Sequence, residues 1–259
     1  MSIRVRVGMK QKIKKQRYNV LDILRGVAVI MMVIYHTMWD IVYLFGVQIP
    51  YFKDGAGFVF QQSICWTFIL VSGFCWSLGG KKLKRALTVI VCALVLTAVT
   101  AVFMPDSIII HGVLSFLGVA MLVMIPADRV LGKVPPTVGM AVSAILFMLT
   151  YDIDSGIIGF GKSFTFELPE SLYANTLTAF FGFPHKEFFS ADYFPLFPWI
   201  FLFLTGYFLY GLCRKKDLLR YFSAFTCRPL EFIGRHSLEI YMAHQPIIYA
   251  LLFLIFKLK

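Results

Sequence analysis

Residues 20–45 read VLDILRGVAVIMMVIYHTMWDIVYLF, a stretch long and apolar enough to cross a membrane as one helix. Four of its residues are ionisable: Asp22, Arg25, His36 and Asp40. Charged groups are costly in hydrocarbon, so they normally face the interior of a helix bundle or a water-filled path and mark function. At about 100° per residue all four fall on one narrow stripe, where Asp22 can touch Arg25 and His36 can touch Asp40. This stripe is the strongest functional signal in the chain.

The composition of the whole chain is that of a membrane protein. Its 259 residues are 59% hydrophobic and 15% charged, with a mean hydropathy of +0.76, whereas soluble domains carry about a quarter charged residues. The net charge of +11 sits in short basic clusters between apolar segments, so nucleic-acid binding is not expected. The five cysteines and five histidines show no metal-ligand spacing, and we expect no metal.

Seven segments are long and apolar enough to span a membrane, which predicts an all-α polytopic helical bundle of seven to eight spans. They are Val20–Phe45, Phe58–Gly79, Ala86–Met104, Ile108–Ile125, Val134–Tyr151, Pro195–Leu212 and Leu238–Phe256. A shorter apolar piece, Leu172–Phe183, is interpreted as an interfacial or re-entrant helix, with an eighth span as the alternative. Asp217–Cys227 predicts a short amphipathic helix on the inner surface. We expect a basic segment, 1–19, followed by one membrane domain, 20–259.

The lysines and arginines are distributed unevenly over the two sides that these spans would separate. With the N-terminus inside, 19 of the 25 lie in cytoplasmic segments and 5 in outer ones, while Arg25 lies within the first span. Cytoplasmic segments of membrane proteins carry an excess of Lys and Arg. The pattern therefore predicts a cytosolic N-terminus, an outer C-terminus and an outer location for the polar stretch Asp152–Tyr193.

Helix rise gives the stripe a direction across the membrane. Arg25 lies about one turn inside the cytoplasmic boundary, and His36 lies ~16 Å further along the axis, toward the outside. Arg25 could hold a phosphate-bearing donor, because a guanidinium matches phosphate geometry. His36, oriented by Asp40, could act as a base or nucleophile toward an amine or hydroxyl. The alternative is a structural Asp22–Arg25 ion pair and a core histidine.

Further polar residues could line the same interior. These secondary candidates are His111, His244, Gln245, Asp192, Tyr193 and Trp199. His111 begins the fourth span, where an interfacial histidine is equally expected. His244 and Gln245 lie deep in the seventh span. The last three surround the outer start of the sixth span, where prolines and an interfacial Trp are common in any case.

Three motifs together resemble one family, the bacterial branch of the heparan-α-glucosaminide N-acetyltransferase catalytic-domain family. They are Asp22-Ile-Leu-Arg25-Gly26-Val-Ala28 running to Tyr35-His36, Asp192-Tyr193-Phe-Pro195-Leu-Phe197-Pro198-Trp199, and Gly234-Arg-His236-Ser237-Leu-Glu239-Ile-Tyr241 with His244-Gln-Pro246. The first motif also resembles the broader transmembrane acyltransferases, which carry an Arg and a His eleven apart in their first span.

The resemblance implies transfer of an acetyl (acyl) group from cytosolic acetyl-CoA to an amino or hydroxyl group of an extracytoplasmic sugar or glycolipid. It assigns His36 to the chemistry and Arg25 to the donor side. We expect Asp40 to orient His36, and Asp22 to line the donor entrance together with Arg25. Arg235 could attract the phosphates of coenzyme A, although the positive-inside pattern also explains it. We expect a multi-pass protein of the prokaryotic cytoplasmic membrane, and a homodimer is left open.

Two hypotheses from other functional classes compete with the acetyltransferase hypothesis. A transporter or flippase could use the same polar stripe as a proton or substrate path. A membrane subunit without catalysis is the third reading, which the stripe disfavours.

Overall fold

The computed structural model describes residues 17–53, 55–161 and 164–257. Most of the predicted basic segment, residues 1–16, lies outside the described residues, as do Lys162 and Lys259. In the described part, seven helices are long and apolar enough to cross a membrane, which confirms the all-α polytopic bundle. They are α1 (Asn19–Tyr43), α3 (Ala56–Trp76), α4 (Lys82–Phe103), α5 (Val113–Leu131), α6 (Pro136–Leu149), α8 (Leu196–Lys215) and α10 (Ser237–Lys257).

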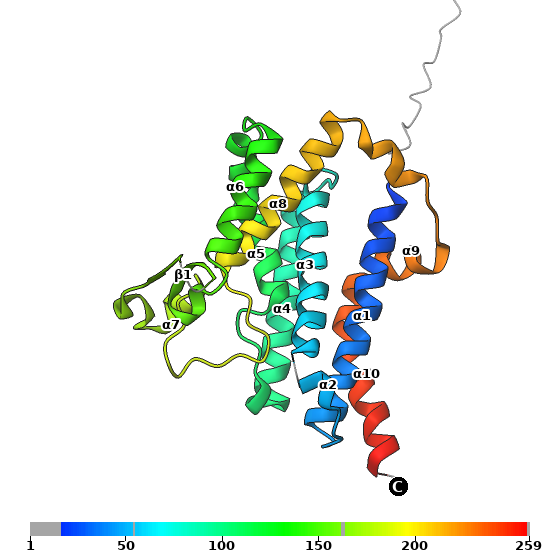
Figure 1. Ribbon diagram of the computed structural model, residues 1–259. Helices are drawn as coiled ribbons and strands as arrows, with labels where there is room; N and C mark the ends of the chain where they lie inside the picture. Colours follow the sequence, from blue (N-terminus) through cyan, green and yellow to red (C-terminus); the bar gives the residue numbers. More distant parts are fainter. Residues whose placement is uncertain (1–16, 54, 162–163, 258–259) are drawn as a thin grey trace, which may run out of the picture.

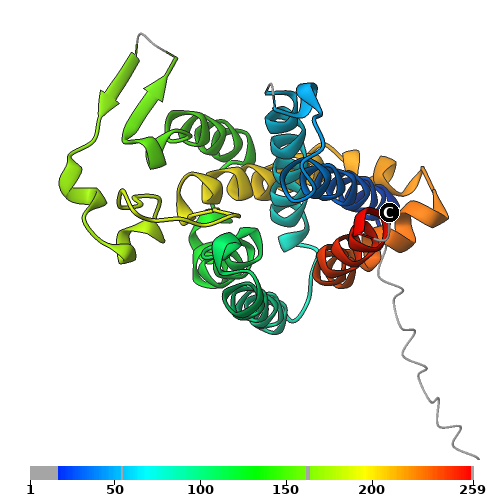
Figure 2. The same cartoon turned by 90° about the horizontal axis from the view of Figure 1, so that it is seen from below.

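The long helices run up and down in one bundle, with α3 near its middle (Figures 1 and 2). α3 packs on α8 on one side and on α1 on the other, α6 packs on α8, and α4 pairs with α5. α1 in turn carries α10 and the shorter helix α9 (Arg228–Arg235). The basic clusters at 81–85 and 214–216 lie at the same end of the bundle (Figure 1).

A glycine on each helix allows α3 and α8 to cross closely. A Cβ on Gly73 of α3 would lie 1.9 Å from the Phe203 carbonyl oxygen, and one on Gly206 of α8 would lie 2.1 Å from that of Leu70. Membrane helices associate through close backbone approach, since apolar side chains gain little by leaving lipid for protein. The α3–α8 crossing therefore depends on small residues at both positions.

The described residues between α6 and α8 form no long helix, so the helix predicted at Leu172–Phe183 is wrong. The segment forms the 3-10 helix η3 (Glu170–Tyr173) and a single turn, α7 (Thr176–Ala179). Asn175 caps that turn by accepting hydrogen bonds from the Leu177 and Thr178 N–H groups. Gly182, which follows the end of α7, has a φ of 112°, and a residue in that conformation cannot continue a helix.

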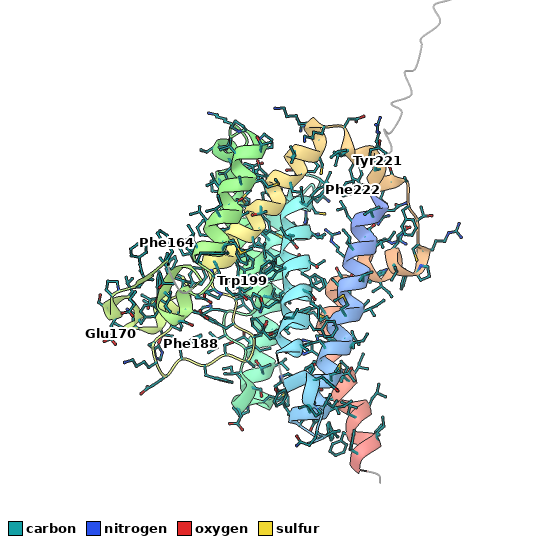
Figure 3. The ribbon with its side chains drawn as sticks, viewed as in Figure 1. Phe164, Glu170, Phe188, Trp199, Tyr221 and Phe222 are labelled. Atoms are coloured by element: carbon teal, nitrogen blue, oxygen red, sulfur yellow. The ribbon has the colours of Figure 1, made fainter. Side chains whose placement is uncertain are left out.

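A β-hairpin precedes this turn and was not predicted. Its strands are β1 (Ile157–Phe160) and β2 (Phe164–Glu167), which pair antiparallel. Phe164 projects from the hairpin at the side of the bundle (Figure 3). The remaining short elements are α2 (Pro50–Lys53), η1 (Pro105–Ser107), η2 (Ile153–Ser155) and η4 (Leu218–Ser223).

Two further boundaries differ from the predicted ones. The fourth span begins at Val113 rather than Ile108, because residues 108–111 pair with the loop before α8: Ala191 N–H donates to Ile108 and Phe194 N–H to the His111 carbonyl. The predicted amphipathic helix at 217–227 shrinks to η4. Its Phe222 stacks on Phe74 of α3, with ring centroids 5.3 Å apart.

Candidate active site

The stripe on α1 faces α10 and the bundle interior rather than lipid. Asp22 and Asp40 are buried, at 8% and 0% exposure, while Arg25 and His36 are half-buried. The structure divides the four residues between two places about three turns apart on the helix. In the topology that the charge distribution predicts, Asp22 and Arg25 mark the cytoplasmic end, and His36 and Asp40 mark the outer end, and the two places are named accordingly below.

Asp22 holds Arg25 at the cytoplasmic end. Its Oδ1 lies 3.5 Å from Arg25 Nη1, and its Oδ2 accepts a hydrogen bond of 3.1 Å from Arg17 Nε. α9 packs directly over this segment: a Cβ on Gly234 would lie 1.8 Å from the Asp22 carbonyl oxygen. The predicted contact between Asp22 and Arg25 is present, and backbone packing restrains it.

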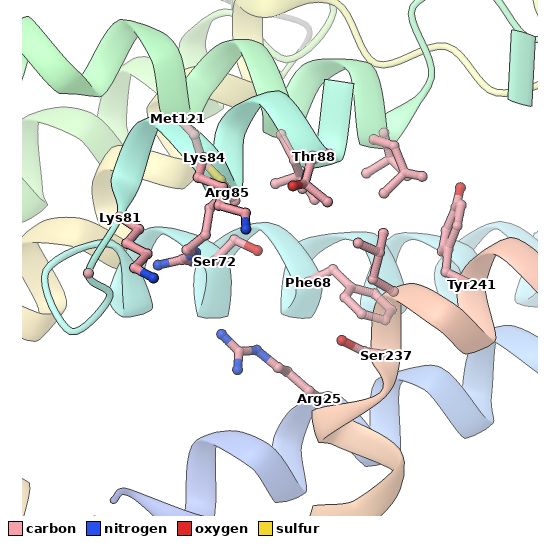
Figure 4. A pocket seen from close by; sticks show the side chains of 16 residues that line it. Arg25, Phe68, Ser72, Lys81, Lys84, Arg85, Thr88, Met121, Ser237 and Tyr241 are labelled. Atoms are coloured by element: carbon pink, nitrogen blue, oxygen red, sulfur yellow. The ribbon is translucent and has the colours of Figure 1, made fainter. Parts of the chain in front are cut away.

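Arg25 lines a cavity of about 510 Å³ between α1, α3, α4, α5 and α10. We call this the cationic cavity, because three more basic side chains line it. Its lining residues are Arg25, Phe68, Ser72, Gly80, Lys81, Lys84, Arg85, Thr88, Val89, Val113, Leu114, Leu117, Met121, Ser237, Leu238 and Tyr241. The four cations gather toward one end, and Phe68 and Tyr241 lie toward the other (Figure 4). The lining includes no carboxylate, so the cationic end is suited to an anionic group.

Arg85 reaches the cavity because Gly79 leaves room for it. A Cβ on Gly79 would lie 1.7 Å from Arg85 Nη1, so a larger residue there would displace the guanidinium. The three basic residues of α4 and its approach, Lys81, Lys84 and Arg85, were read from sequence only as positive-inside charges. The tight Lys/Arg cluster directly before an apolar span was the signal for them, but it is common to many membrane proteins.

His36 and His244 lie together at the outer end. Their ring centroids are 4.8 Å apart, and the His36 ring also meets Tyr35 edge-on at 5.5 Å. Tyr241, which lines the cationic cavity, lies one turn from His244 with ring centroids 5.4 Å apart. The histidine pair therefore adjoins the aromatic end of the cavity, opposite its cations.

The hydrogen bond of His244 decides which ring nitrogen carries its proton. Nδ1 lies 2.5 Å from the Tyr241 carbonyl oxygen, which can only accept, so Nδ1 donates. In the neutral ring Nε2 is then a bare acceptor, and it is buried with no hydrogen-bond partner among the described residues. His244 thus presents a free lone pair beside His36.

Asp40 pairs with α10 instead of orienting His36. Gln245 Nε2 donates a hydrogen bond of 2.8 Å to Asp40 Oδ1, so the partner of this carboxylate in the described part of the chain comes from α10. The prediction that Asp40 orients His36 is therefore corrected, because the carboxylate turns toward α10 and not along its own helix. In the part of the chain that the structure describes, Asp40 Oδ2 and Gln245 Oε1 are buried and have no hydrogen-bond partner. Together with His244 Nε2 they form three unpaired acceptor atoms on α1 and α10.

Two candidates in the loop before α8 join that loop to its neighbours, Asp192 to α5 and Tyr193 to α7. Asp192 Oδ2 accepts from the Val113 N–H at 2.9 Å and so caps α5, and Tyr193 Oη donates to the Ala179 carbonyl at 2.6 Å. Burial raises the pKa of Asp192 to about 6, partly offset by the Val113 hydrogen bond. Because Val113 lines the cationic cavity, Asp192 lies at its outer boundary.

The remaining predicted residues lie away from the histidine pair. His111 precedes α5 with its ring against Phe180 and Phe188, and burial lowers its pKa. Trp199 is only 7% exposed and packs in the aromatic core of α6 and α8 (Figure 3). Arg235 is exposed, with Nε donating to the Glu231 carbonyl, and it does not line the cationic cavity. The basic side chains that share the cavity with Arg25 are Lys81, Lys84 and Arg85, and not the predicted Arg235.

The described residues contain no group of three or more His, Cys, Asp or Glu that could hold a metal ion. What this part of the chain offers instead is a cavity with a cationic end and an apolar wall, and three buried acceptor atoms on α1 and α10. Such an arrangement can hold a charged ligand at one end and remove a proton at the other.

Comparison with curated proteins and with solved structures finds no match for the chain. A family model described as heparan-alpha-glucosaminide N-acetyltransferase, catalytic, matches residues 17–246, which include α1, the cationic cavity and the histidine pair. The chain therefore belongs to the heparan-alpha-glucosaminide N-acetyltransferase catalytic-domain family and is, by that membership, a membrane acetyltransferase.

Proposed function

We propose that the protein transfers an acetyl group from cytosolic acetyl-CoA to an amino or hydroxyl group of an extracytoplasmic sugar or glycolipid, in the cytoplasmic membrane of a prokaryote. The observation that carries this proposal is the cationic cavity. It joins a cluster of four cations to Tyr241, next to the pair of His36 and His244. A donor with phosphates at one end and a thioester at the other matches that polarity.

In this proposal the donor phosphates bind Arg25, Lys81, Lys84 and Arg85. Guanidinium groups bind phosphate through paired N–H donors, and ammonium groups bind it as point charges. Asp22 keeps Arg25 in place through the 3.5 Å ion pair. The pantetheine arm then lies along the apolar lining, which brings the thioester toward Tyr241.

The acceptor group would bind at the outer end, where three buried atoms find no hydrogen-bond partner among the residues that the structure describes. Asp40 Oδ2, Gln245 Oε1 and His244 Nε2 all accept hydrogen bonds. An amine or hydroxyl supplies the N–H or O–H donors that such atoms need, and leaving them unpaired would cost about 1–3 kcal/mol each. This chemistry supports an amino or hydroxyl acceptor.

His36, with His244 beside it, would take the proton from the acceptor as its nitrogen or oxygen attacks the thioester carbonyl. A new C–N or C–O bond forms, the C–S bond breaks, and the proton passes to the departing coenzyme A thiolate. The family leaves a second route open, in which His36 first accepts the acetyl group and then passes it on. Both routes make His36 essential.

The test is acetyl-CoA turnover by the purified protein against a panel of amino sugars and cell-envelope glycans. We expect turnover with at least one acceptor and its loss in His36→Ala, by about 100-fold or more if the imidazole is the base. A His36→Ala protein that transfers at the wild-type rate contradicts the role of His36. Transport by the same polar stripe is the second candidate function, and membership of an acetyltransferase family does not favour it.

A further inference from the structure

One flank of the cationic cavity lies between α10 and the α4–α5 pair. α10 packs on α1 and α9, and α4 packs on α5; in the part of the chain that is described, no comparable packing joins α10 to α4 or α5. α10 stands apart from the α4–α5 pair when the bundle is seen from below (Figure 2). Yet Thr88 of α4 and Tyr241 of α10 both line the cavity. On this flank the cavity is therefore not closed by helix packing.

The rim of this flank continues into the lipid-facing surface of α4. Lys84 and Thr88 are exposed although they line the cavity. Leu83, Leu87 and Val91, on the adjoining face, are 55%, 48% and 58% exposed. Exposed apolar residues on a membrane-spanning helix contact lipid chains. The open flank therefore borders on the bilayer.

The two ends of the cavity differ in chemistry as the two ends of an anionic lipid do. Its cations include Lys81 and Lys84 at the start of α4, on the side that the charge distribution makes cytoplasmic. Its deeper wall is apolar, with Leu117 and Met121 among the lining residues. Basic pockets between membrane helices on the cytoplasmic side bind anionic lipid headgroups.

We infer that an anionic phospholipid of the inner leaflet enters the cationic cavity from the side, between α4 and α10. Its phosphate binds Lys81 and Lys84, and one acyl chain lies along the apolar wall while the other stays in the bilayer. The donor is proposed to bind the same cations, so the lipid competes with acetyl-CoA. This competition is the part of the inference that rests on the proposed function.

Native mass spectrometry of the purified full chain tests the lipid site directly. With phosphatidylglycerol and phosphatidylcholine titrated separately, we expect tighter binding of the anionic lipid and about fivefold weaker binding in Lys84→Ala. Lys216→Ala is the matched control, because Lys216 is an exposed cation at the same end of the bundle that does not line the cavity. Equal binding of the two lipids, or equal loss in both variants, overturns the inference.

Two additions separate the alternatives. Millimolar inorganic phosphate should not displace the phospholipid; displacement would mean that the site recognises phosphate alone and would overturn the lateral lipid site. Coenzyme A, which carries no acetyl group to transfer, should displace one phosphatidylglycerol molecule. Both ligands bound to one chain would overturn a shared cavity. A chain that binds phosphatidylglycerol at Lys84 but not coenzyme A would overturn the proposed function and leave the lipid site standing.

Discussion

The close crossing of α1 and α9 predicts how strongly a substitution at Gly234 perturbs the protein. At this crossing a Cβ on Gly234 would lie 1.8 Å from the Asp22 carbonyl oxygen and 3.0 Å from the Gly26 nitrogen. On the other side, a Cβ on Gly26 would lie 2.2 Å from the Leu230 carbonyl oxygen. All these neighbours are backbone atoms, so no side-chain rotation can make room. Gly234→Ala must push the two helices apart.

Non-bonded carbon–oxygen contacts are about 3.3 Å, so α9 and α1 must separate locally by about 1.5 Å. Overpacking of this kind costs about 1–3 kcal/mol. The displaced segment carries Asp22, which holds Arg25 at 3.5 Å in the cationic cavity. Since a misplacement of about 1 Å can lower a rate about 100-fold, we expect acetyl-CoA turnover to fall at least tenfold.

The measurements are thermal unfolding in detergent and acetyl-CoA turnover of Gly234→Ala. Gly80→Ala is the control for stability, because a Cβ at Gly80 meets nothing within 4 Å. We expect the apparent Tm to fall for Gly234→Ala and to stay near the wild-type value for Gly80→Ala. A Gly234→Ala protein with wild-type Tm and turnover would refute the argument that this crossing positions Arg25.

Three further predictions address single groups. Gln245→Leu leaves the buried Asp40 carboxylate without its 2.8 Å hydrogen bond, so the free energy of unfolding should fall by about 1–3 kcal/mol; an unchanged apparent Tm would contradict this. Burial raises the pKa of Asp192 from 3.8 to about 6, so the folded state favours the protonated carboxyl. The stability that this protonated group contributes is present in full below about pH 4 and is lost as the pH rises through about 6. Asp192→Asn should weaken that dependence of Tm on pH while still accepting from Val113, and an identical pH profile would exclude Asp192 as its source. Arg25→Gln should raise the KM for acetyl-CoA about tenfold with a smaller change in kcat, and an unchanged KM would remove Arg25 from the donor site.

Much of the fold could be read from the sequence because each part of it is local. Seven apolar runs of membrane-spanning length are found again as seven long helices. The stripe on α1 was predicted from helix periodicity, and its residues do face the interior. The errors came where backbone and loop contacts override composition, as at Leu172–Phe183, where Asn175 caps a single turn, and at residues 108–112.

The site was less accessible to sequence reasoning because its pairs join distant parts of the chain. Asp40 and Gln245 are 205 positions apart, and the expectation that Asp40 would turn to its neighbour His36 followed from spacing on one helix alone. The sequence indicated only that Lys84 and Arg85 are positive-inside charges, whereas the packing of the helices brings them to the same cavity as Arg25.

The sequence by itself determined that this protein spans a membrane and that its first span carries buried ionisable groups. Both follow from the length of apolar runs, the cost of charge in hydrocarbon and the helical repeat, which act within one segment. Only the tertiary structure decided that His36 meets His244 rather than Asp40, and that four cations share a cavity. The physical reason is that these contacts depend on how closely neighbouring helices approach, which is set by backbone packing at residues such as Gly26 and Gly234.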